Sequence, residues 1–241
     1  MLDGFRMRNP GRSLAGILFY EFCWHVCLGV MKVFFGMRVR DGHNEPPAQA
    51  GAHLVILNHQ SHFDPILAGM AVRRRHLYFI ARSGLFSNRL FGWLIRSLNS
   101  IPLNQKAADT AAMRAAIDQL KSGRSVLIFP EGSRTPDGAM HGFKRGFWLL
   151  LSRSTVPVLP VAVEGAYDAW PRRASRPTLF RKVRVKVAPP IPAQTLLDMG
   201  EDAALRHLQA VIENMRQDLA DEMRAEGVRI TTQPRVDAHT D

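Results

Sequence analysis

The amino-acid sequence predicts an α/β sandwich, a sheet with helices on its faces, preceded by an apolar helix. Between residues 53 and 226, short runs of branched aliphatic residues alternate with helix-compatible stretches. This alternation is typical of a sheet flanked by helices. The 241 residues are 46% hydrophobic and 22% charged, as in an ordinary globular protein with one sizeable domain. That composition excludes a disordered chain, a collagen-like repeat and a polytopic membrane protein.

The charge balance indicates a partner rich in phosphate. Lys and Arg number 32 against 21 Asp and Glu, which gives a formal net charge of +11. Such an excess of cations favours nucleic acid or anionic lipid headgroups. The two cysteines, Cys23 and Cys27, both lie in the apolar stretch, so they form neither a disulfide framework nor a four-ligand zinc site. A reducing cytoplasm is the simplest setting for this chain.

The first element is an apolar stretch at residues 14–36, which is long enough for a helix to cross a bilayer. Glu21, His25 and Lys32 interrupt it and fall within about 40° of one another on a helix, so they form one narrow polar seam. Positive charge flanks both ends, so neither end is marked as the translocated one. We therefore expect a helix that lies in or dips into one leaflet, within a membrane-associating segment at residues 1–40. A buried core helix is the alternative.

The next elements begin the body of the protein. Residues 41–51 are rich in turn-forming residues and predict a linker. Residues 53–57 predict a short buried strand. Asp64 and Pro65 are typical of a helix start, and a helix-compatible stretch follows at residues 66–75.

Residues 77–81 predict a second short strand. Residues 85–98 form an amphipathic segment, which we interpret either as a lipid contact or as an ordinary buried helix. The Ala-rich residues 107–122 predict a helix that ends at Gly123.

The second half of the chain continues the alternation. Residues 125–129 predict a buried strand that runs into a turn of Pro, Gly and small polar residues. Two further strands are predicted at residues 156–163 and 183–187, and the second has Val alternating with Arg184 and Lys186, which predicts one wet face. A polar-faced helix follows them and precedes the C-terminal tail; its residues are 203–226.

Two imidazoles and one carboxylate follow the first strand of the body, in the sequence NHQSHFD. A His–Asp pair fixes the tautomer of the ring, so that its other nitrogen can take a proton. Spacing does not decide whether His59 or His62 is the base that pairs with Asp64. A metal site at these three residues has no further His or Glu cluster to support it. The plain alternative is that Asp64 caps the helix and the histidines are surface residues.

A second polar group follows the strand at residues 125–129. Glu131 and Arg134 leave the strand end on a turn, in which Gly132 allows close approach of the backbone to a ligand. The planar guanidinium of Arg134 suits a phosphate because it binds two oxygens at once. A Glu–Arg ion pair without a ligand is the alternative. There is no G-x-S-x-G, P-loop or G-x-G-x-x-G motif, which argues against a serine hydrolase, an NTPase and a dinucleotide enzyme.

Together the two groups resemble a known family, the glycerolipid acyltransferases of the lysophosphatidate acyltransferase (1-acylglycerol-3-phosphate O-acyltransferase) type. NHQSHFD is similar to the N-H-x4-D block of that family, and FPEGSRT is similar to its F-P-E-G-[ST]-R block. VPVLPVAVEG resembles its hydrophobic proline block, and GFKRG resembles its F-K-x-G element. The resemblance spans roughly residues 53–192. It implies a glycerol-3-phosphate acyltransferase-like mixed sheet flanked by helices.

The resemblance also implies a role for each matching residue. His59 is then the general base and Asp64 its orienting partner, which decides against His62. The residues implied to bind the acceptor lie in the second block or at the position where the family usually has a phosphate-contacting Lys. They are Arg82, Glu131, Gly132, Ser133 and Arg134. The resemblance implies no metal ion and no cofactor.

The implied activity is acyl transfer from acyl-CoA or acyl carrier protein to the free hydroxyl of a lysophospholipid. The expected acceptor is 1-acyl-sn-glycerol-3-phosphate, which gives phosphatidic acid. The expected partners include an anionic membrane surface and no nucleic acid, and the expected location is the cytoplasmic face of a membrane, the bacterial inner membrane. Residues 41–228 are then the acyltransferase domain, and residues 229–241 a flexible tail.

Two positions depart from the family pattern. Gln105 stands where the family often has Arg, and Arg89 stands where Pro is usual. The acceptor headgroup is therefore less well defined than the reaction, and another lysolipid, such as lyso-ornithine lipid, is the alternative acceptor. The alternative from another class is a non-catalytic basic protein that binds membranes or nucleic acid. It leaves the His–Asp and Glu–Arg groups unexplained.

Overall fold

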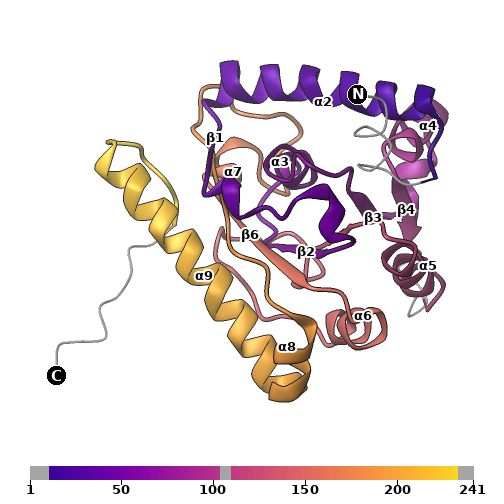
Figure 1. Ribbon diagram of the computed structural model, residues 1–241. Coiled ribbons are helices and arrows are strands. Elements are labelled where there is room, and N and C mark those ends of the chain that lie inside the picture. The colour runs from indigo at the N-terminus through magenta and orange to yellow at the C-terminus, as the bar shows by residue number, and fades with distance from the viewer. Residues whose placement is uncertain (1–10, 104–109, 233–241) are drawn as a thin grey trace, which may run out of the picture.

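The protein is built around one sheet with helices on both faces (Figure 1). The structure, a computed structural model, describes residues 11–103 and 110–232. Within these residues the strands are β1 (Arg38–Arg40), β2 (Leu54–Leu57), β3 (Tyr78–Arg82), β4 (Ser100–Leu103), β5 (Val126–Ile128), β6 (Val158–Glu164) and β7 (Arg184–Val187). The helices are α2 (Leu14–Phe35), α3 (Asp64–Ala71), α4 (Arg89–Ser97), α5 (Thr110–Lys121), α6 (Gly146–Ser154), α7 (Ala166–Ala169), α8 (Ala193–Met199) and α9 (Glu201–Ala225). Short 3-10 turns lie at η1 (Gly42–Asn44), η2 (Ala48–Ala50) and η3 (Ser83–Phe86).

The sheet is mixed, as the family resemblance implied. Its strand order is β1-β7-β6-β2-β5-β3-β4. The β6–β7 pair is antiparallel, with Val163 opposite Val185, and the other neighbouring strands are parallel. Because β2, β3, β5 and β6 run in one direction, their carboxyl ends lie at the same edge of the sheet. That edge is the usual position of a ligand site in a parallel α/β sheet.

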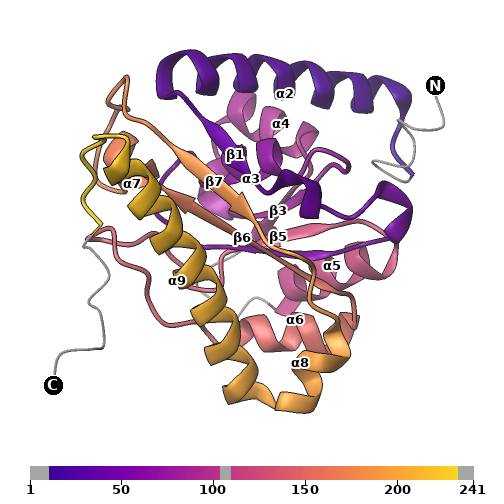
Figure 2. The same cartoon turned by 60° about the vertical axis from the view of Figure 1, so that its left-hand side comes forward.

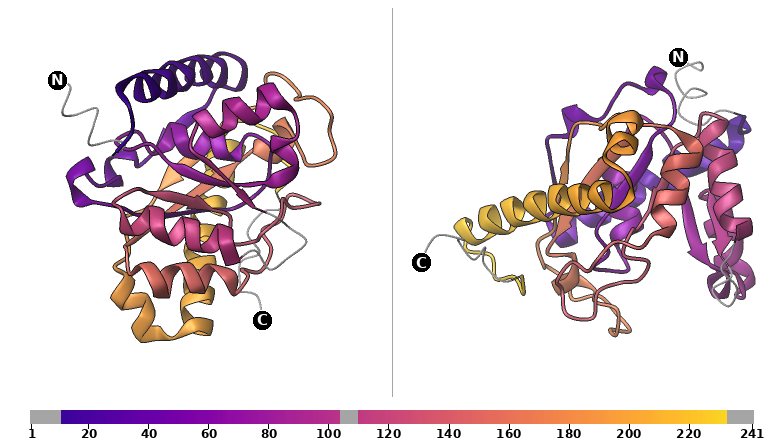
Figure 3. Two further views of the ribbon diagram at one scale, coloured as in Figure 1. Left: turned by 90° about the vertical axis from the view of Figure 1, so that its right-hand side faces the viewer. Right: turned by 90° about the horizontal axis from the view of Figure 1, so that it is seen from below.

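Two apolar layers join the sheet to its helices, and Figure 3 shows the resulting stack. In β2, Leu54 and Ile56 belong to the layer formed with α5, α6, α8 and α9. Val55 and Leu57 belong to the layer formed with α2, α3 and α7. All four side chains are fully buried. A strand in the middle of a sheet covered on both faces is apolar throughout, which explains the run HLVIL in the sequence.

Helix α2 lies flat across the body (Figures 1 and 2). Four side chains spread along its length are buried, namely Ile17, Tyr20, Met31 and Phe35. The indole Nε1 of Trp24 donates to the carbonyl of Gly69 in α3 at 2.7 Å. In the polar seam, Glu21 Oε1 lies 3.0 Å from Nε2 of the buried His76, whereas His25 and Lys32 are exposed.

The outer face of α2 is apolar and exposed. It carries Leu18, Phe22, Val26, Val30 and Val33. Because only four of the 22 residues are buried, the alternative of a buried core helix is wrong. Within the described part of the chain, α2 is the one helix long and apolar enough to cross a membrane by length and composition.

The amphipathic segment expected at residues 85–98 divides into η3 and α4, with Asn88 as the N-cap of the helix. Gly92 is the one buried residue of α4, while Leu90 and Trp93 are 75% and 56% exposed. The alternative of a buried helix is therefore wrong here too. The Trp93 ring packs on Phe19 of α2, with ring centroids 5.5 Å apart. The exposed apolar faces of α2 and α4 thus adjoin each other.

The predicted wet face of β7 is covered by α9. Arg184 is 1% exposed, and its guanidinium lies 2.5 Å from Glu226. Lys186 pairs with Asp218 at 3.0 Å, and Arg40 of β1 pairs with Glu222. The cations of β1 and β7 therefore face the acidic side of α9, and the prediction of a solvent-exposed face on β7 is wrong. Alternating charge along a strand does not reveal that a helix of opposite charge covers it.

Residues near both boundaries of the expected domain contact the body of the protein. Strand β1, inside the expected segment 1–40, pairs with β7, so residues 38–40 belong to the sheet. The expected linker is tied to the body, because buried Glu45 accepts the backbone amides of Arg73 and Arg74 at 2.9 and 2.7 Å. In the expected flexible tail, Thr232 is buried and its hydroxyl donates to Glu164 at 2.7 Å. Residues 233–241 lie outside the described residues.

Candidate active site

The polar groups singled out in the sequence meet at the carboxyl edge of the sheet. The NHQSHFD segment follows β2, the FPEGSRT segment follows β5, and Arg82 is the last residue of β3. Strands β2 and β5 are parallel neighbours, with Ile56 opposite Ile128. Two segments more than 70 residues apart in sequence therefore lie side by side.

His59 and Asp64 form a hydrogen-bonded pair. Nδ1 of His59 lies 2.7 Å from Oδ2 of Asp64. A proton on Nδ1 donated to the carboxylate leaves the lone pair on Nε2. No described residue hydrogen-bonds Nε2, and the side chain of His59 is 16% exposed. The ring is thus oriented on one side and open to a reactant on the other.

The carboxyl group of Asp64 is completely buried at the start of α3. Its Oδ2 also accepts the backbone amide of Ser61 at 2.7 Å, while Oδ1 has no partner among the described residues. Burial raises the pKa of Asp64, and the hydrogen bond with His59 opposes that rise. The buried carboxylate therefore holds the ring of His59 in place through Oδ2.

The backbone of His59 is held on both sides by the FPEGSRT segment. Its amide donates to Oε1 of Glu131 at 2.6 Å, and its carbonyl accepts the amide of Thr135 at 2.8 Å. Its ring stacks on Phe129, with the centroids 3.8 Å apart and the planes at 13°. The imidazole therefore has little freedom to move away from Asp64.

Glu131 joins two segments through backbone contacts. It is 4% exposed, and its second oxygen, Oε2, accepts the amide of His141 at 2.9 Å. Burial raises the pKa of Glu131 to about 7, against the two amide hydrogen bonds, which lower it. Both carboxylate oxygens thus contact the protein itself.

The turn after β5 depends on glycine. The amide of Gly132 donates to the carbonyl of Phe129 at 2.9 Å, and its φ is +71°. A Cβ at this position comes within 2.9 Å of Cδ of Lys144. The backbone conformation therefore favours glycine, and a side chain here would displace the flexible end of Lys144. Ser133, the next residue, is half-buried.

Three guanidinium groups gather beside the His–Asp pair without a carboxylate partner. Arg134 is half-buried, and burial, followed by the charge of Arg82, lowers its pKa; Arg172 acts in the same direction. None of the three forms an ion pair with a described residue. The ion-pair alternative for Glu131 and Arg134 is therefore wrong, and the repulsion among the cations favours an anion bound between them.

His62 lies apart from the carboxylate. Its ring centroid is 4.7 Å from that of Trp170, and its Nε2 lies 3.4 Å from the carbonyl of Arg172. Burial, followed by the charge of Arg134, lowers the pKa of His62. The spacing of the motif left two candidates for the partner of Asp64, and of these His59 is the one in hydrogen-bond contact.

The structure adds residues that the sequence did not single out. Trp170 accepts the Ser61 hydroxyl at 2.8 Å and the His62 amide at 3.3 Å through its carbonyl. Asn58 exchanges two hydrogen bonds with the backbone of Val163 in β6, at 2.8 and 2.9 Å. These contacts give no sequence signal, because backbone groups of distant residues make them. Gln105, the departure from the family pattern, lies outside the described residues.

No cluster of three or more His, Cys, Asp or Glu side chains that could hold a metal ion occurs within residues 11–103 and 110–232. The same residues contain both cysteines, which are free thiols on α2.

Comparison with known proteins identifies the family. The profile of the acyltransferase family matches residues 38–164, which is more than half of the chain. The chain belongs to the acyltransferase family. The crystal structure of the 1-acyl-sn-glycerophosphate (LPA) acyltransferase PlsC from Thermotoga maritima has a TM-score of 0.71 to it at 26% identity, over 90% of this chain and 86% of that chain. The fold that the resemblance implied is thereby confirmed.

Curated relatives bear similar names. A 1-acyl-sn-glycerol-3-phosphate acyltransferase of Bacillus subtilis is 25% identical over 70% of this chain and 79% of its own length. The alpha enzyme of that name from Ovis aries is 33% identical over 69% of this chain and 58% of its own length. One from Streptococcus pneumoniae is 31% identical over 49% of this chain and 44% of its own length. The chain thus spans about half the length of the last two relatives.

Proposed function

We propose that this acyltransferase moves a fatty acyl group from a thioester to the free hydroxyl of a lysophospholipid. The hydroxyl oxygen attacks the thioester carbonyl while its proton passes to Nε2 of His59, and the imidazolium that forms is stabilised by Asp64. The C–S bond then breaks, and the proton moves from the imidazolium to the leaving thiolate. The observation that carries this proposal is the 2.7 Å contact of His59 Nδ1 with buried Asp64, with Nε2 left open.

The proposed acceptor is 1-acyl-sn-glycerol-3-phosphate, which gives phosphatidic acid. The guanidiniums of Arg82 and Arg134 lie at one edge of the sheet without an ion-pair partner among the described residues, and a phosphate monoester supplies the missing negative charge. Gly132 and Ser133 lie on the same turn as Arg134 and complete the acceptor side of the site. The names of the relatives specify the same acceptor.

Glu131 serves the acceptor site indirectly in this proposal. Both of its oxygens accept backbone amides, those of His59 and His141. Its carboxylate therefore positions the base and the turn that carries Arg134. Glu131 is thus a positioning residue. The proposed acyl donor is the thioester of acyl-CoA or of acyl carrier protein.

The enzyme works at a membrane surface in this proposal, on the cytoplasmic face of a bacterial inner membrane. The exposed apolar faces of α2 and α4 enter the headgroup region, while the buried contacts of Trp24 and Glu21 keep α2 flat on the body. Burying one large apolar side chain is worth about 1.5–3 kcal/mol, so three or four from α2 are enough for interfacial binding. The net charge of +11 adds attraction to anionic headgroups.

The product of the reaction tests the proposal. The full chain in detergent is incubated with palmitoyl-CoA or palmitoyl-acyl carrier protein as donor and with 1-acyl-sn-glycerol-3-phosphate or lyso-ornithine lipid as acceptor, and the lipids are analysed by mass spectrometry. We expect phosphatidic acid from the first acceptor. The departure at Gln105 leaves room for lyso-ornithine lipid as the acceptor. If that lipid alone is acylated, the proposed acceptor is wrong. If neither thioester donor gives an acylated lipid, the proposed reaction is wrong.

A further inference from the structure

A short loop before β7, residues 179–182, exposes two large apolar side chains. Leu179 is 48% exposed and Phe180 is 69% exposed. Both are followed by cations, Arg181 and Lys182, which are also exposed. Apolar side chains next to basic ones are the combination that binds to an anionic lipid surface, because the former enter the acyl boundary while the latter contact headgroup phosphates.

The loop is attached to the end of α2. The amide of Phe180 donates to the carbonyl of Phe34 at 2.8 Å, and the two aromatic rings lie 6.2 Å apart. Lys182 lies over Gly36, with Nζ 2.9 Å from the point where a Cβ at that glycine lies. The exposed apolar face of α2 therefore continues onto the loop.

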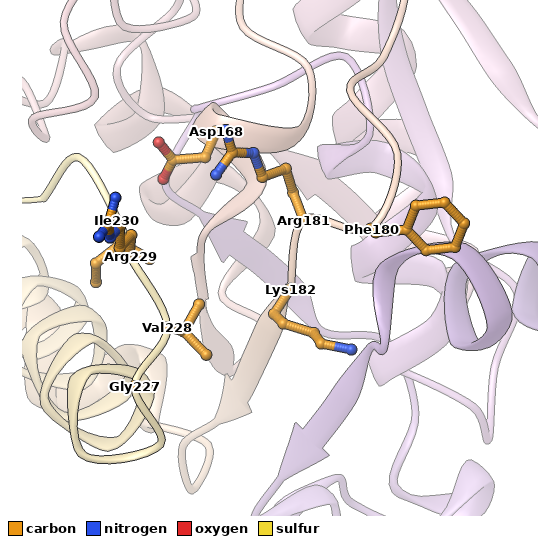
Figure 4. Close-up of a pocket in the computed structure, with 8 residues that line it drawn as sticks. All are labelled: Asp168, Phe180, Arg181, Lys182, Gly227, Val228, Arg229 and Ile230. Carbon is orange, nitrogen blue, oxygen red and sulfur yellow. The ribbon is translucent and has the colours of Figure 1, made fainter.

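Phe180 has a backbone conformation that aromatic residues avoid. Its φ is +62°, in the left-handed region that a residue with a Cβ rarely adopts. The bond to Phe34 holds this conformation, and the ring is 69% exposed against the described residues. Figure 4 shows the ring beside α2. The exposed ring is therefore available to a partner.

A basic pocket lies on the other side of the loop. Its volume is about 340 Å³, and the last turn after α9 forms its far wall. Its lining residues include Arg181, Lys182 and Arg229 and one carboxylate, Asp168. Figure 4 shows the ammonium of Lys182 pointing away from Asp168. Both oxygens of that carboxylate already accept hydrogen bonds from Thr231. The lining therefore has an excess of positive charge that a phosphate group balances.

We propose that residues 179–182 and the basic pocket form a second lipid contact, in which Leu179 and Phe180 enter the membrane and Arg181, Lys182 and Arg229 bind phosphate headgroups of anionic lipids. This inference rests on the proposed membrane association of α2. The first contact is the outer face of α2 with α4, and the second lies at the opposite end of α2. Two contacts at the two ends of one helix fix the orientation of the body on the surface.

Sedimentation of the full chain with vesicles tests this proposal. The vesicles are either pure phosphatidylcholine or a mixture with phosphatidylglycerol. R181Q/K182Q removes two cations of the contact, and R114Q/K121Q removes two exposed cations from α5, which belongs to the opposite apolar layer. F180N removes the ring while keeping a residue that tolerates positive φ, and L149N is its control on α6, where Leu149 is 41% exposed. Circular dichroism confirms that each variant is folded.

We expect R181Q/K182Q to bind mixed vesicles about 30-fold more weakly than wild type, since each cation near an anionic surface contributes roughly fivefold. Its binding to pure phosphatidylcholine should not change. F180N should weaken binding to both vesicles, and both controls should resemble wild type. If R181Q/K182Q and F180N behave like their controls, the second contact is refuted. If wild type binds neither vesicle, the proposed membrane association of α2 is overturned as well. If binding is lost only in an α2 variant such as F22S/V26S, α2 binds the membrane as proposed and the second contact does not exist.

Discussion

Replacing Glu131 by Gln tests how the base is positioned. The wild-type carboxylate accepts the amides of His59 and His141 at 2.6 and 2.9 Å. In E131Q one acceptor oxygen becomes an NH₂ group that faces an N–H donor. A hydrogen bond to a charged group contributes about 1.5–3 kcal/mol. If about 2 kcal/mol of this energy holds His59 in its catalytic position, its loss raises the activation barrier by the same amount and lowers the rate roughly 30-fold.

The assay is the rate of thiol release from palmitoyl-CoA as the concentration of the lysophospholipid acceptor is varied. We expect kcat of E131Q to fall about 30-fold while the KM for the acceptor stays within about twofold, because a positioning residue affects the transition state without touching the acceptor. E45Q is the matched control. Glu45 is also buried and accepts two backbone amides, but it lies away from the strand ends that carry the site. A rise in acceptor KM with unchanged kcat in E131Q refutes the positioning role.

The same residue gives a pH dependence of stability. Burial raises the pKa of Glu131 from 4.5 to about 7, so between these values the folded protein binds a proton that the unfolded chain has released. The contribution of Glu131 to stability is therefore fully favourable below pH 4.5 and is lost as the pH rises through about 7, by roughly 3 kcal/mol in all. The stability of E131Q relative to wild type should rise over that range in chemical denaturation, and a constant difference contradicts the assignment.

Three further substitutions test other parts of the account. D64N should lower kcat about 10²- to 10⁴-fold in the thiol-release assay while the acceptor KM changes little, since the imidazolium loses its counter-charge; a wild-type kcat contradicts the role of Asp64. R134A should raise the acceptor KM at least tenfold and spare slow thioester hydrolysis; unchanged acceptor kinetics refute its phosphate contact. R184M should lower the free energy of unfolding in urea by more than R38A does, because the guanidinium of Arg184 is buried against Glu226 and the carbonyl of Gly36, whereas the side chain of Arg38 is 57% exposed and its loss should cost less than about 1 kcal/mol; equal losses contradict the distinction.

The apolar strands inside the sheet were predictable from sequence, and the two edge strands were not. The buried run of β2 is apolar on both faces because helices cover both sides of the sheet, and such a run gives a clear signal. β1 and β4 at the two edges have three and four residues, one of them with charged side chains and the other with a proline. Their positions depend on pairing with β7 and β3, which are distant in sequence.

The interpretation of β7 shows where local pattern fails. Arg184 and Lys186 alternate with valines, which is typical of a solvated face. The face is instead covered by α9 and its C-cap. Their acidic residues, Asp218, Glu222 and Glu226, come roughly 30 to 40 residues later. The complementarity of two distant charged surfaces is a tertiary property, and hydrophobic periodicity does not detect it.

The candidate site was predictable in its chemical groups but not in its contacts. The types and spacing of His59, Asp64, Glu131 and Arg134 were visible in the sequence, and their convergence follows from the parallel pairing of β2 and β5. The hydrogen bonds that Glu131 accepts from backbone amides depend on the path of the backbone after each strand, which residue types do not specify. For the same reason the stacking of Phe129 on His59 was not foreseen.

The most direct test of the central claim is thiol release from palmitoyl-CoA by the purified full chain, with and without 1-acyl-sn-glycerol-3-phosphate, measured beside H59A. H62A is the control, because His62 lies in the same segment but packs on Trp170 instead of Asp64. The account predicts acceptor-dependent release by wild type and H62A and a loss of about 10²- to 10⁴-fold in H59A. Acceptor-dependent release by H59A at the wild-type rate contradicts the assignment of His59 as the base.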